Sequence, residues 1–460
     1  MTHDVLTRST TSRVPPDAPG TRLMGSASDL RHRVLDAQVN AMTNCGDVVR
    51  FVAGPPGARL RLYSVYAPEG VQQILATNSR GYRKDNRFYR EIRAQIGDGL
   101  LTSQDDEWLR QKRFVQPSFT RERVTAYAPV MAAQARELVE RWHGAANSGE
   151  PVELHAAMTE LAMRIVGRLL FGADLERAAG VLHRDFPVLS GDVRRRGFNA
   201  LCAPRSWPTP ANRRAARARR SLYGVVDELI AERRASGMGG DDLLGRLLAA
   251  RDADTQLDNQ EIRDQLLVFM FAGHDTTATA LSFALHLLGT HDHVQRRAIA
   301  EVDDVLAGAV PEAQDVPELA HLGRVVRETL RLYPPAYGTS RRVVIDEPVC
   351  GYRIPPGSDV AVYTYATHRH PRHWDDPERF DPDRFLPEPS AGRHRYAWFP
   401  FGGGPRGCIG TQFALLESTI VLATILQRYR VSTPPGPVPL ATRITLHPAV
   451  PMPCRLTLRR

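Results

Sequence analysis

Apolar residues along most of this chain recur every three to four positions, the spacing that places them on one face of an α-helix. The repeat is clearest over residues 124–170 and 221–248. It returns over residues 322–332, where Pro334 and Pro335 are expected to end the helix. The middle of the chain is therefore predicted to be mostly helical.

One helical pattern is longer than the others and begins at an N-terminal signal. Asp258 followed by Glu261 resembles a capping box, in which each side chain bonds the backbone of the other residue. The pattern then continues without proline, which predicts a helix of about 30 residues and ~45 Å. Its middle, residues 266–272, is apolar on every face, so we expect it to be buried.

Short runs rich in β-branched and aromatic residues lie nearer the two ends of the chain. Residues 47–52 and 59–63 flank a Gly-Pro-Pro-Gly sequence and predict a hairpin. Later runs are residues 341–346, 351–354 and 360–363, which we expect to complete the same small sheet, and patches of the tail 434–460. The predicted fold class is mainly α with a small β domain.

Two stretches interrupt these patterns. Residues 78–104 are irregular, with three aromatic residues among them. Residues 186–220 contain four prolines and many arginines, which predicts short helices and loops. The densest basic run, residues 213–220, has helical spacing and is interpreted as a solvated helix face.

Composition and charge narrow the class of protein. Apolar residues make up 42% of the 460 residues and charged residues 24%, which is typical of a globular protein with a large core. The net charge of +9 is spread along the chain without interleaved aromatic residues, so no nucleic-acid partner is expected. An acidic protein partner stays open, because positive potential attracts anionic partners.

Cysteine usage and the N-terminus predict the compartment. The five cysteines are widely spaced without a paired pattern, which favours a reduced, intracellular protein. Residues 1–20 hold three prolines and no apolar stretch long enough for a signal peptide or membrane anchor. We expect a cytoplasmic monomer without a stable membrane anchor, with a flexible leader over residues 1–25 and one domain over residues 26–460.

The most informative stretch, residues 401–410, is rich in glycine and contains one cysteine. Glycines tolerate backbone angles closed to other residues, so successive N–H groups can turn towards a thiolate. No second cysteine lies nearby, which excludes a structural zinc site. Taken alone, Cys408 could equally be a buried structural cysteine. Such a residue needs neither the glycines nor Arg406, so the pattern favours a sulfur presented to a metal.

This loop resembles the haem-binding loop of the cytochrome P-450 superfamily. The matching residues are Phe401, Gly402, Gly404, Arg406, Cys408 and Gly410. The resemblance implies a soluble bacterial member that binds heme b (iron protoporphyrin IX), with the Cys408 thiolate as the axial iron ligand. It also implies that the haem lies between the long central helix and the helix following Cys408.

A polar sequence inside the long helix, residues 272–277, also resembles a motif of this family. Buried hydroxyl and carboxyl groups cost free energy unless they are bonded. Thr276 could bond back to the carbonyl of Ala272, and Asp275 could form a buried ion pair. The sequence nevertheless matches the family's oxygen-activation motif, in which the acid and the threonine deliver protons to dioxygen. Gly273 is interpreted as thinning the helix so that a small ligand can approach.

Further residues match the family's haem-propionate positions. Trp108 and Lys112 lie four apart on a predicted helix and therefore share one face. Lys112 stands where the family usually has Arg or His, so it supplies charge but no bidentate fork. Arg341 matches another propionate position, with Arg342 as the alternative if the register differs by one residue.

The family's most characteristic helix motif is also present, as Glu328 and Arg331 before a Tyr-Pro-Pro sequence. In the family this pair joins an arginine from a later loop, and the Pro-Glu-Arg-Phe sequence makes Arg379 the expected third member. A buried triad of this kind is interpreted as a device for folding and haem assembly rather than for catalysis.

The resemblance implies a monooxygenase that inserts one oxygen atom of O2 into an apolar small molecule of terpenoid, polyketide, fatty-acyl or steroid-like type, in bacterial secondary metabolism. The residues expected to line the substrate pocket are Val268, Phe271, Ala272 and Tyr337. Two alternatives stay open: a peroxide-driven or isomerase-type haem-thiolate enzyme, and a non-catalytic haem sensor. Neither needs the Asp275–Thr276 pair.

Electrons are expected to come from other proteins. The sequence contains no flavin or iron–sulfur pattern, such as a second cysteine cluster or a Gly-x-Gly-x-x-Gly after a strand. An acidic ferredoxin and its ferredoxin reductase are therefore the expected donors. The basic residues implied in ferredoxin docking are Arg110, Arg113, Arg121 and Arg123.

Overall fold

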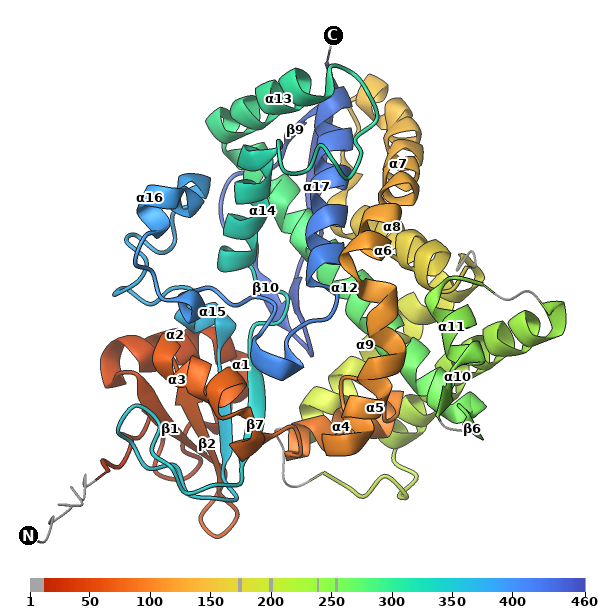
Figure 1. Ribbon diagram of the computed structural model, residues 1–460. Helices are drawn as coiled ribbons and strands as arrows, with labels where there is room; N and C mark the ends of the chain where they lie inside the picture. Colours follow the sequence, from red (N-terminus) through yellow and green to blue (C-terminus); the bar gives the residue numbers. More distant parts are fainter. Residues whose placement is uncertain (1–11, 173–175, 198–201, 238–239, 253–254, 460) are drawn as a thin grey trace, which may run out of the picture. The chain divides into compact units, whose positions relative to one another are not determined.

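The computed structural model describes residues 12–172, 176–197, 202–237, 240–252 and 255–459. They form two compact units, each assembled from separate segments (Figure 1). The first unit comprises the chain up to Asn86, Gly338–Asp375 and His394–Arg406, and the second comprises Arg87–Tyr337, Asp376–Arg393 and Gly407–Arg460. Helices dominate and the strands form small sheets, so the predicted fold class is confirmed.

A five-stranded sheet organises the first unit. Its strands, in spatial order, are β1 (Val48–Ala53), β2 (Leu60–Val65), β8 (Asp359–Val362), β7 (Thr339–Val343) and β3 (Tyr82–Arg83). The antiparallel β1 and β2 form the predicted hairpin, whose connection needs positive φ at Gly54 (110°) and Gly57 (86°). β8 runs parallel to β2 and antiparallel to β7, which unites the early and late runs as predicted. The run at 351–354 contributes only an isolated bridge.

Short helices accompany this sheet. They are α1 (Ala27–His32), α2 (Val34–Cys45), α3 (Pro68–Gln72), the π-helical turn Gln73–Thr77 and α15 (Thr364–Thr367). Val71, Ile74 and Leu75 from the α3 region pack with the sheet residues Val65 and Val360 in one buried cluster. This burial of apolar side chains stabilises the unit.

The chain from Arg13 onward is attached to the first unit. Arg13 bridges Tyr352, and the Asp17 carboxylate accepts a hydrogen bond of 2.8 Å from the guanidinium of Arg50. The flexible leader predicted for residues 1–25 is therefore fixed over its second half, while residues 1–11 lie outside the described residues. The single domain over residues 26–460 stays a prediction.

The second unit is mainly helical (Figure 1). Its helices are α4 (Arg87–Ile96), α5 (Asp105–Val115), α6 (Arg121–Ala126), α7 (Ala128–Ser148), α8 (Leu154–Leu170), α9 (Glu176–Gly197), α10 (Pro210–Ser236), α11 (Leu243–Ala249), α12 (Asn259–Thr290), α13 (Asp292–Leu306), α14 (Ala320–Leu332), α16 (Pro387–Ser390) and α17 (Thr411–Arg428). Its strands are β4 (Val152–Glu153), β5 (Arg251–Asp252), β6 (Thr255–Gln256), β9 (Tyr429–Ser432), β10 (Leu440–Thr442), β11 (Leu446–Pro448) and β12 (Pro453–Leu458). The tail thus forms strands, as predicted.

Helix α12 is the predicted long helix and lies at the centre of this unit. Both hydrogen bonds of the capping box between Asp258 and Glu261 are present. Helices α8, α14 and α17 pack against α12, and its apolar residues from Ile262 to Leu288 are almost all buried. The helix is therefore held by packing along most of its length.

Helices occur in both of the stretches that interrupt the predicted patterns. Residues 78–104 include α4, whose Tyr89, Ile92 and Ile96 are buried on one face. The 186–220 stretch holds the end of α9, with Pro187 inside it, and the start of α10. Burial of the apolar face of α9 compensates for the backbone hydrogen bond that a proline removes, a loss of about 3 kcal/mol. Pro210 occupies the first turn of α10, where a missing N–H costs nothing.

No helix among the described residues is both long enough and apolar enough to cross a membrane.

Candidate functional site

The glycine-rich loop owes its course to close backbone packing. Gly404 has φ of 64°, and a Cβ there would overlap the carbonyl oxygen of Leu75. A Cβ at Gly403 would overlap the Tyr396 ring. These residues, with Phe401 and Arg406, belong to the first unit. Glycine is therefore required here by contact within that unit, which is a structural reason beyond any effect on the sulfur.

Cys408 lies in the second unit, just before α17. It is exposed, its carbonyl accepts a hydrogen bond of 2.9 Å from the Thr411 hydroxyl, and Gly410 is the N-cap residue. A Cβ at Gly410 would lie 3.8 Å from the Cys408 sulfur, an ordinary contact. The positive end of a helix dipole stabilises nearby negative charge, so this position suits a thiolate.

Helix α12 is less covered at two residues of its polar sequence than elsewhere. Ala272 is exposed and Thr276 is partly exposed, although the helix is otherwise buried on both sides of them. The Thr276 hydroxyl donates a hydrogen bond of 2.6 Å to the Ala272 carbonyl, which is the backbone bond that the sequence left as an alternative. A hydroxyl at the edge of an uncovered helix face is accessible to a small molecule.

The Asp275 carboxylate is buried, and its partners lie in and after the turn between β10 and β11. It accepts a hydrogen bond from the Thr445 hydroxyl, and its Oδ1 lies 3.6 Å from Nδ1 of His447. The buried ion pair considered for Asp275 thus involves a histidine, and only when that histidine is protonated. Sequence reasoning did not identify Thr445 or His447, because their strand pattern carries no sign of the helix they face.

The interpretation of Gly273 is wrong. A Cβ at this position would lie 2.8 Å from Cγ2 of Val166 on α8. The missing side chain allows α8 to approach α12 closely. The Cβ position of Gly273 points at α8, so this glycine serves contact between the two helices rather than approach of a ligand. The neighbouring His274 is buried with its ring edge against Phe186.

The residues predicted to bind propionates divide between the two units. In the second unit, the ammonium of Lys112 lies 4.9 Å from the centre of the buried Trp108 ring, so both residues share one face of α5. In the first unit, the Arg341 guanidinium is 5% exposed and donates to the Thr339 hydroxyl (2.7 Å) and the Ser340 carbonyl (2.8 Å). Arg342 instead pairs with Asp359 at 3.2 Å.

The buried triad is present with a different third member. Arg331 donates two hydrogen bonds of 2.7 Å to Glu328, and both side chains are completely buried. Arg384 approaches the same carboxylate at 3.4 Å, whereas Arg379 contributes only its backbone carbonyl (3.1 Å) and turns its guanidinium to Asp381. The prediction for Arg379 is therefore wrong. The Pro-x-Arg-Phe pattern occurs twice within nine residues, at 377–380 and 382–385, and the second copy supplies the side chain.

Burial has the largest effect on the pKa values of Glu328 and Arg384 in this triad. Removal from water raises the pKa of Glu328, and the hydrogen bonds and charge of Arg331 oppose this effect. Burial likewise lowers the pKa of Arg384, against the attraction of Glu328. The cluster is stable as a set because each charge has a partner.

Three of the four residues predicted to line the pocket, Val268, Phe271 and Ala272, lie close together on α12, whereas Tyr337 comes from a later loop. Val268 and Phe271 are buried, and the Phe271 ring contacts the Phe186 ring of α9 at 4.5 Å between centres. The Tyr337 hydroxyl donates a hydrogen bond of 2.9 Å to the Arg443 carbonyl, and burial raises its pKa to about 12. Phe186 is an apolar candidate that the proline-rich pattern around it concealed.

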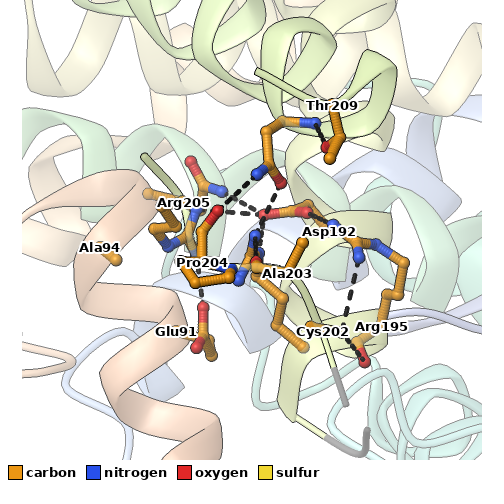
Figure 2. A network of polar contacts seen from close by, with 12 residues as sticks. Glu91, Ala94, Asp192, Arg195, Cys202, Ala203, Pro204, Arg205 and Thr209 are labelled. Carbon is orange, nitrogen blue, oxygen red and sulfur yellow. Dashed lines mark hydrogen bonds and ion pairs between the residues drawn. The ribbon is translucent and has the colours of Figure 1, made fainter. Parts of the chain in front are cut away.

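A polar network fastens the segment between α9 and α10 (Figure 2). At its centre the Asp192 carboxylate, 5% exposed, accepts hydrogen bonds from Gln95 of α4 (2.7 Å), Arg205 (3.1 Å) and Arg195. Arg205 also pairs with Glu91 of α4 (Figure 2). The described part of the segment, from Cys202 onward, is therefore tied to both α4 and α9.

Comparisons with known proteins agree with this geometry. The model of the cytochrome P-450 family matches residues 15–453. The chain is 34% identical to cyclooctat-9-en-7-ol 5-monooxygenase of Streptomyces melanosporofaciens, with 92% of this chain and 93% of that protein covered. It is 35% identical to pentalenene oxygenase of Streptomyces avermitilis (92% and 94% covered) and 36% identical to cyclooctatin synthase of S. melanosporofaciens (85% and 84% covered). The chain belongs to the cytochrome P-450 family and is a monooxygenase of that family.

Proposed function

We propose that this monooxygenase inserts one oxygen atom of O2 into an apolar terpenoid in bacterial secondary metabolism, with heme b bound through Cys408. The observation that carries the proposal is that an exposed cysteine precedes α17 while α12, a neighbour of α17, leaves Ala272 exposed and Thr276 partly exposed. The two helices are in contact within one unit.

The residues present fit a haem. The donor set is a single exposed thiol at a helix N-terminus, as thiolate ligation requires. Trp108, Lys112, Arg341 and Arg406 would supply cations and donors for the propionates, and Phe401 and Gly410 would flank the ligand within the loop. When bound, the haem supplies the activation of dioxygen, a chemistry that side chains lack.

The proposed role of Asp275 and Thr276 is to manage protons. Thr276 holds its hydroxyl at the uncovered face of α12 by donating to the Ala272 carbonyl, so its oxygen remains able to accept a proton. Asp275, the next residue, is buried and bonded by Thr445, which keeps bulk water from the carboxylate. The pair can therefore pass protons singly rather than expose the reacting centre to solvent.

A terpenoid substrate is supported by two independent observations. Val268, Phe271 and Phe186 form buried apolar and aromatic surroundings next to the less covered part of α12, with Ala272 and Tyr337 as further candidates. Relatives matched over more than 90% of their length are named for a cyclooctatenol and for pentalenene. Rings without ionic groups suit such a lining.

We further propose that an acidic ferredoxin delivers the electrons from its reductase. Of the four docking arginines predicted, Arg110 is paired with Glu107 and Glu261, and Arg123 with Asp241, so both serve the fold. Arg113 and Arg121 are exposed. Arg121 also lines a groove of about 440 Å³ together with Arg327, which adds a second arginine to this surface, whereas Arg324 of the same groove pairs with Asp383 at 3.8 Å. A cytoplasmic location and a monomeric state remain proposals.

The test uses purified protein reconstituted with haem. Optical titration with pentalenene, lauric acid and progesterone separates terpenoid from fatty-acyl and steroid binding, and we expect a substrate-type shift with pentalenene alone. Cys408→Ser should abolish the red-shifted ferrous carbonyl band, whereas Cys202→Ser, at another described cysteine, should keep it. An unchanged band in Cys408→Ser would refute the ligand. Lys112→Ala should mainly increase haem loss.

Electron delivery needs its own measurement. With a surrogate ferredoxin and reductase, we expect product formation with oxygen consumption, and a reduction rate that falls as salt screens the basic surface. Charge reversal at Arg121 to Glu should slow reduction, while reversal at exposed Arg31 of the first unit should not. Equal turnover with hydrogen peroxide alone would replace the ferredoxin proposal by the peroxide-driven alternative.

A further inference from the structure

Two histidines, His447 and His155, extend a row of polar groups from Asp275 to the partly exposed side of α8. His447 of β11 is 7% exposed, and its Nε2 lies 2.9 Å from the Thr445 hydroxyl that bonds the Asp275 carboxylate. The His155 ring of α8, which is partly exposed, lies 5.8 Å from the His447 ring between centres. All four residues belong to the second unit.

Hydrogen bonding assigns the proton of neutral His447. The Thr445 hydroxyl has one hydrogen, which it donates to Oδ2 of Asp275, so its bond to His447 must be donated by Nε2–H. Nδ1 is then the basic atom, and it lies 3.6 Å from Oδ1 of Asp275. Thr445 and His447 therefore contact different oxygens of one carboxylate. A proton taken up at Nδ1 arrives beside the oxygen that can receive it.

His155 has the complementary arrangement. The Ser282 hydroxyl donates to the Ala278 carbonyl at 2.6 Å, so the 3.4 Å contact between His155 Nδ1 and this hydroxyl is donated by His155. Its Nε2 is then the basic atom. The two rings meet edge to face, at an interplanar angle of 77°.

The surroundings of His447 favour the neutral ring with brief protonation. Burial lowers the pKa of His447 most, Arg443 and His274 lower it further, and Asp275 raises it. Burial also lowers the pKa of His155, as does His447, whereas Asp275 and Glu153 raise it. A resident imidazolium is disfavoured, so each ring can accept a proton and release it again.

We propose that His447 is a positioning residue that delivers protons to Asp275, with Thr445 fixing its tautomer and His155 as the solvent end of the route. This proposal rests on the proposed role of Asp275. In the transfer, the Nδ1–H bond of the imidazolium breaks and an O–H bond forms on Oδ1, which leaves a neutral imidazole and a neutral carboxylic acid. Asp275 then passes the proton on, and Nδ1 of the neutral His447 ring takes the next proton from Nε2 of a protonated His155, by way of solvent water.

The first experiment measures the linkage without turnover. Histidine labelled with ¹³C at Cε1 is followed by NMR from pH 5 to 8.5 in the diamagnetic ferrous carbonyl form of the full enzyme. The His447 signal is the one missing from His447→Gln, and Asp275→Asn should shift its titration midpoint downward, because the charge that raises it is gone. His286→Gln, at a buried histidine elsewhere on α12, should leave it unchanged. An unmoved midpoint in Asp275→Asn overturns the proposal.

The second experiment measures coupling with pentalenene as the probe. His447→Gln keeps a donor near Thr445 but cannot carry a proton, so product per NADH should fall on the order of 10-fold or more, and the acid limb of its pH profile should vanish. The rate of the first reduction should not change. Thr445→Val should show the same loss and Thr445→Ser should restore it, which keeps the test valid if His447→Gln fails to fold.

The outcomes separate the two proposals. If Asp275→Asn retains full coupling, the proposed role of Asp275 fails and the relay fails with it. If Asp275→Asn loses coupling while His447→Gln and Thr445→Val keep the coupling and pH profile of the parent enzyme, only the relay is overturned.

Discussion

Replacement of Glu328 by Gln should be among the most destabilising single changes in the second unit. Glu328 and Arg331 are both 0% exposed, and Arg331 donates to Pro377 and Arg379 carbonyls as well. The variant keeps the shape of the side chain but leaves Arg331 as a buried charge whose counterion is gone. Loss of one partner of such a pair costs about 3–5 kcal/mol, a large part of the 5–15 kcal/mol that typically stabilises a folded protein.

The two later arginines provide a matched comparison. Arg384 is 8% exposed, lies 3.4 Å from Glu328 and donates to the Asp376 carbonyl at 2.8 Å, so Arg384→Ala should cost about 2–3 kcal/mol. The Arg379 guanidinium is 60% exposed and pairs only near the surface, and Arg379→Ala retains the carbonyl that Arg331 uses. This change should cost less than about 1 kcal/mol.

The assay is equilibrium unfolding in urea followed by far-UV circular dichroism, on all three variants and the parent protein under one set of conditions. The expected order of destabilisation is Glu328→Gln, then Arg384→Ala, then Arg379→Ala. Equal losses for the two arginine variants, or a loss below about 1 kcal/mol for Glu328→Gln, would refute the reasoning from burial and contact.

Three further changes test other features. Gly273→Ala should destabilise the protein by about 1–3 kcal/mol because its Cβ would meet Val166 at 2.8 Å, and Val166→Ala should recover part of this in a double-mutant cycle; additive losses would contradict the contact. Asp192→Asn should speed amide hydrogen exchange over residues 202–209, and unchanged protection there would show that the network does not hold the segment. Burial lowers the pKa of His286 below 6.5, so the folded state binds fewer protons than the unfolded state. Unfolding free energy should therefore fall as pH drops through and below about 6.5, and less steeply in His286→Gln; identical slopes in urea titrations would count against this.

Local patterns predicted those parts of the molecule that local interactions determine. The capping box, the apolar run of α12 and the Gly-Pro hairpin each depend on neighbours in sequence, and each is present. Helix α9 was missed because Pro187 lowers helix propensity, whereas the burial that compensates comes from residues distant in sequence.

The candidate site divides in the same way. Cys408, Asp275 and Thr276 carry recognisable sequence patterns, but the Thr445 hydroxyl that bonds Asp275 comes from a turn about 170 residues later in the chain. Arg379 and Arg384 occupy equivalent places in a repeated Pro-x-Arg-Phe pattern, so only the fold distinguishes them. Gly273 shows that a glycine beside a functional residue can serve helix packing.

The Asp192 network has a consequence for how the segment between α9 and α10 can tolerate sequence change. Each arginine of the network can be lost while the others still neutralise the carboxylate, but loss of Asp192 leaves all of them without their common acceptor (Figure 2). Substitution of a single arginine should therefore be tolerated, whereas substitution of Asp192 should not. Phe186, whose ring packs on Phe271 of α12, takes no part in these polar contacts, so its exchange would alter apolar packing without releasing the segment from α4.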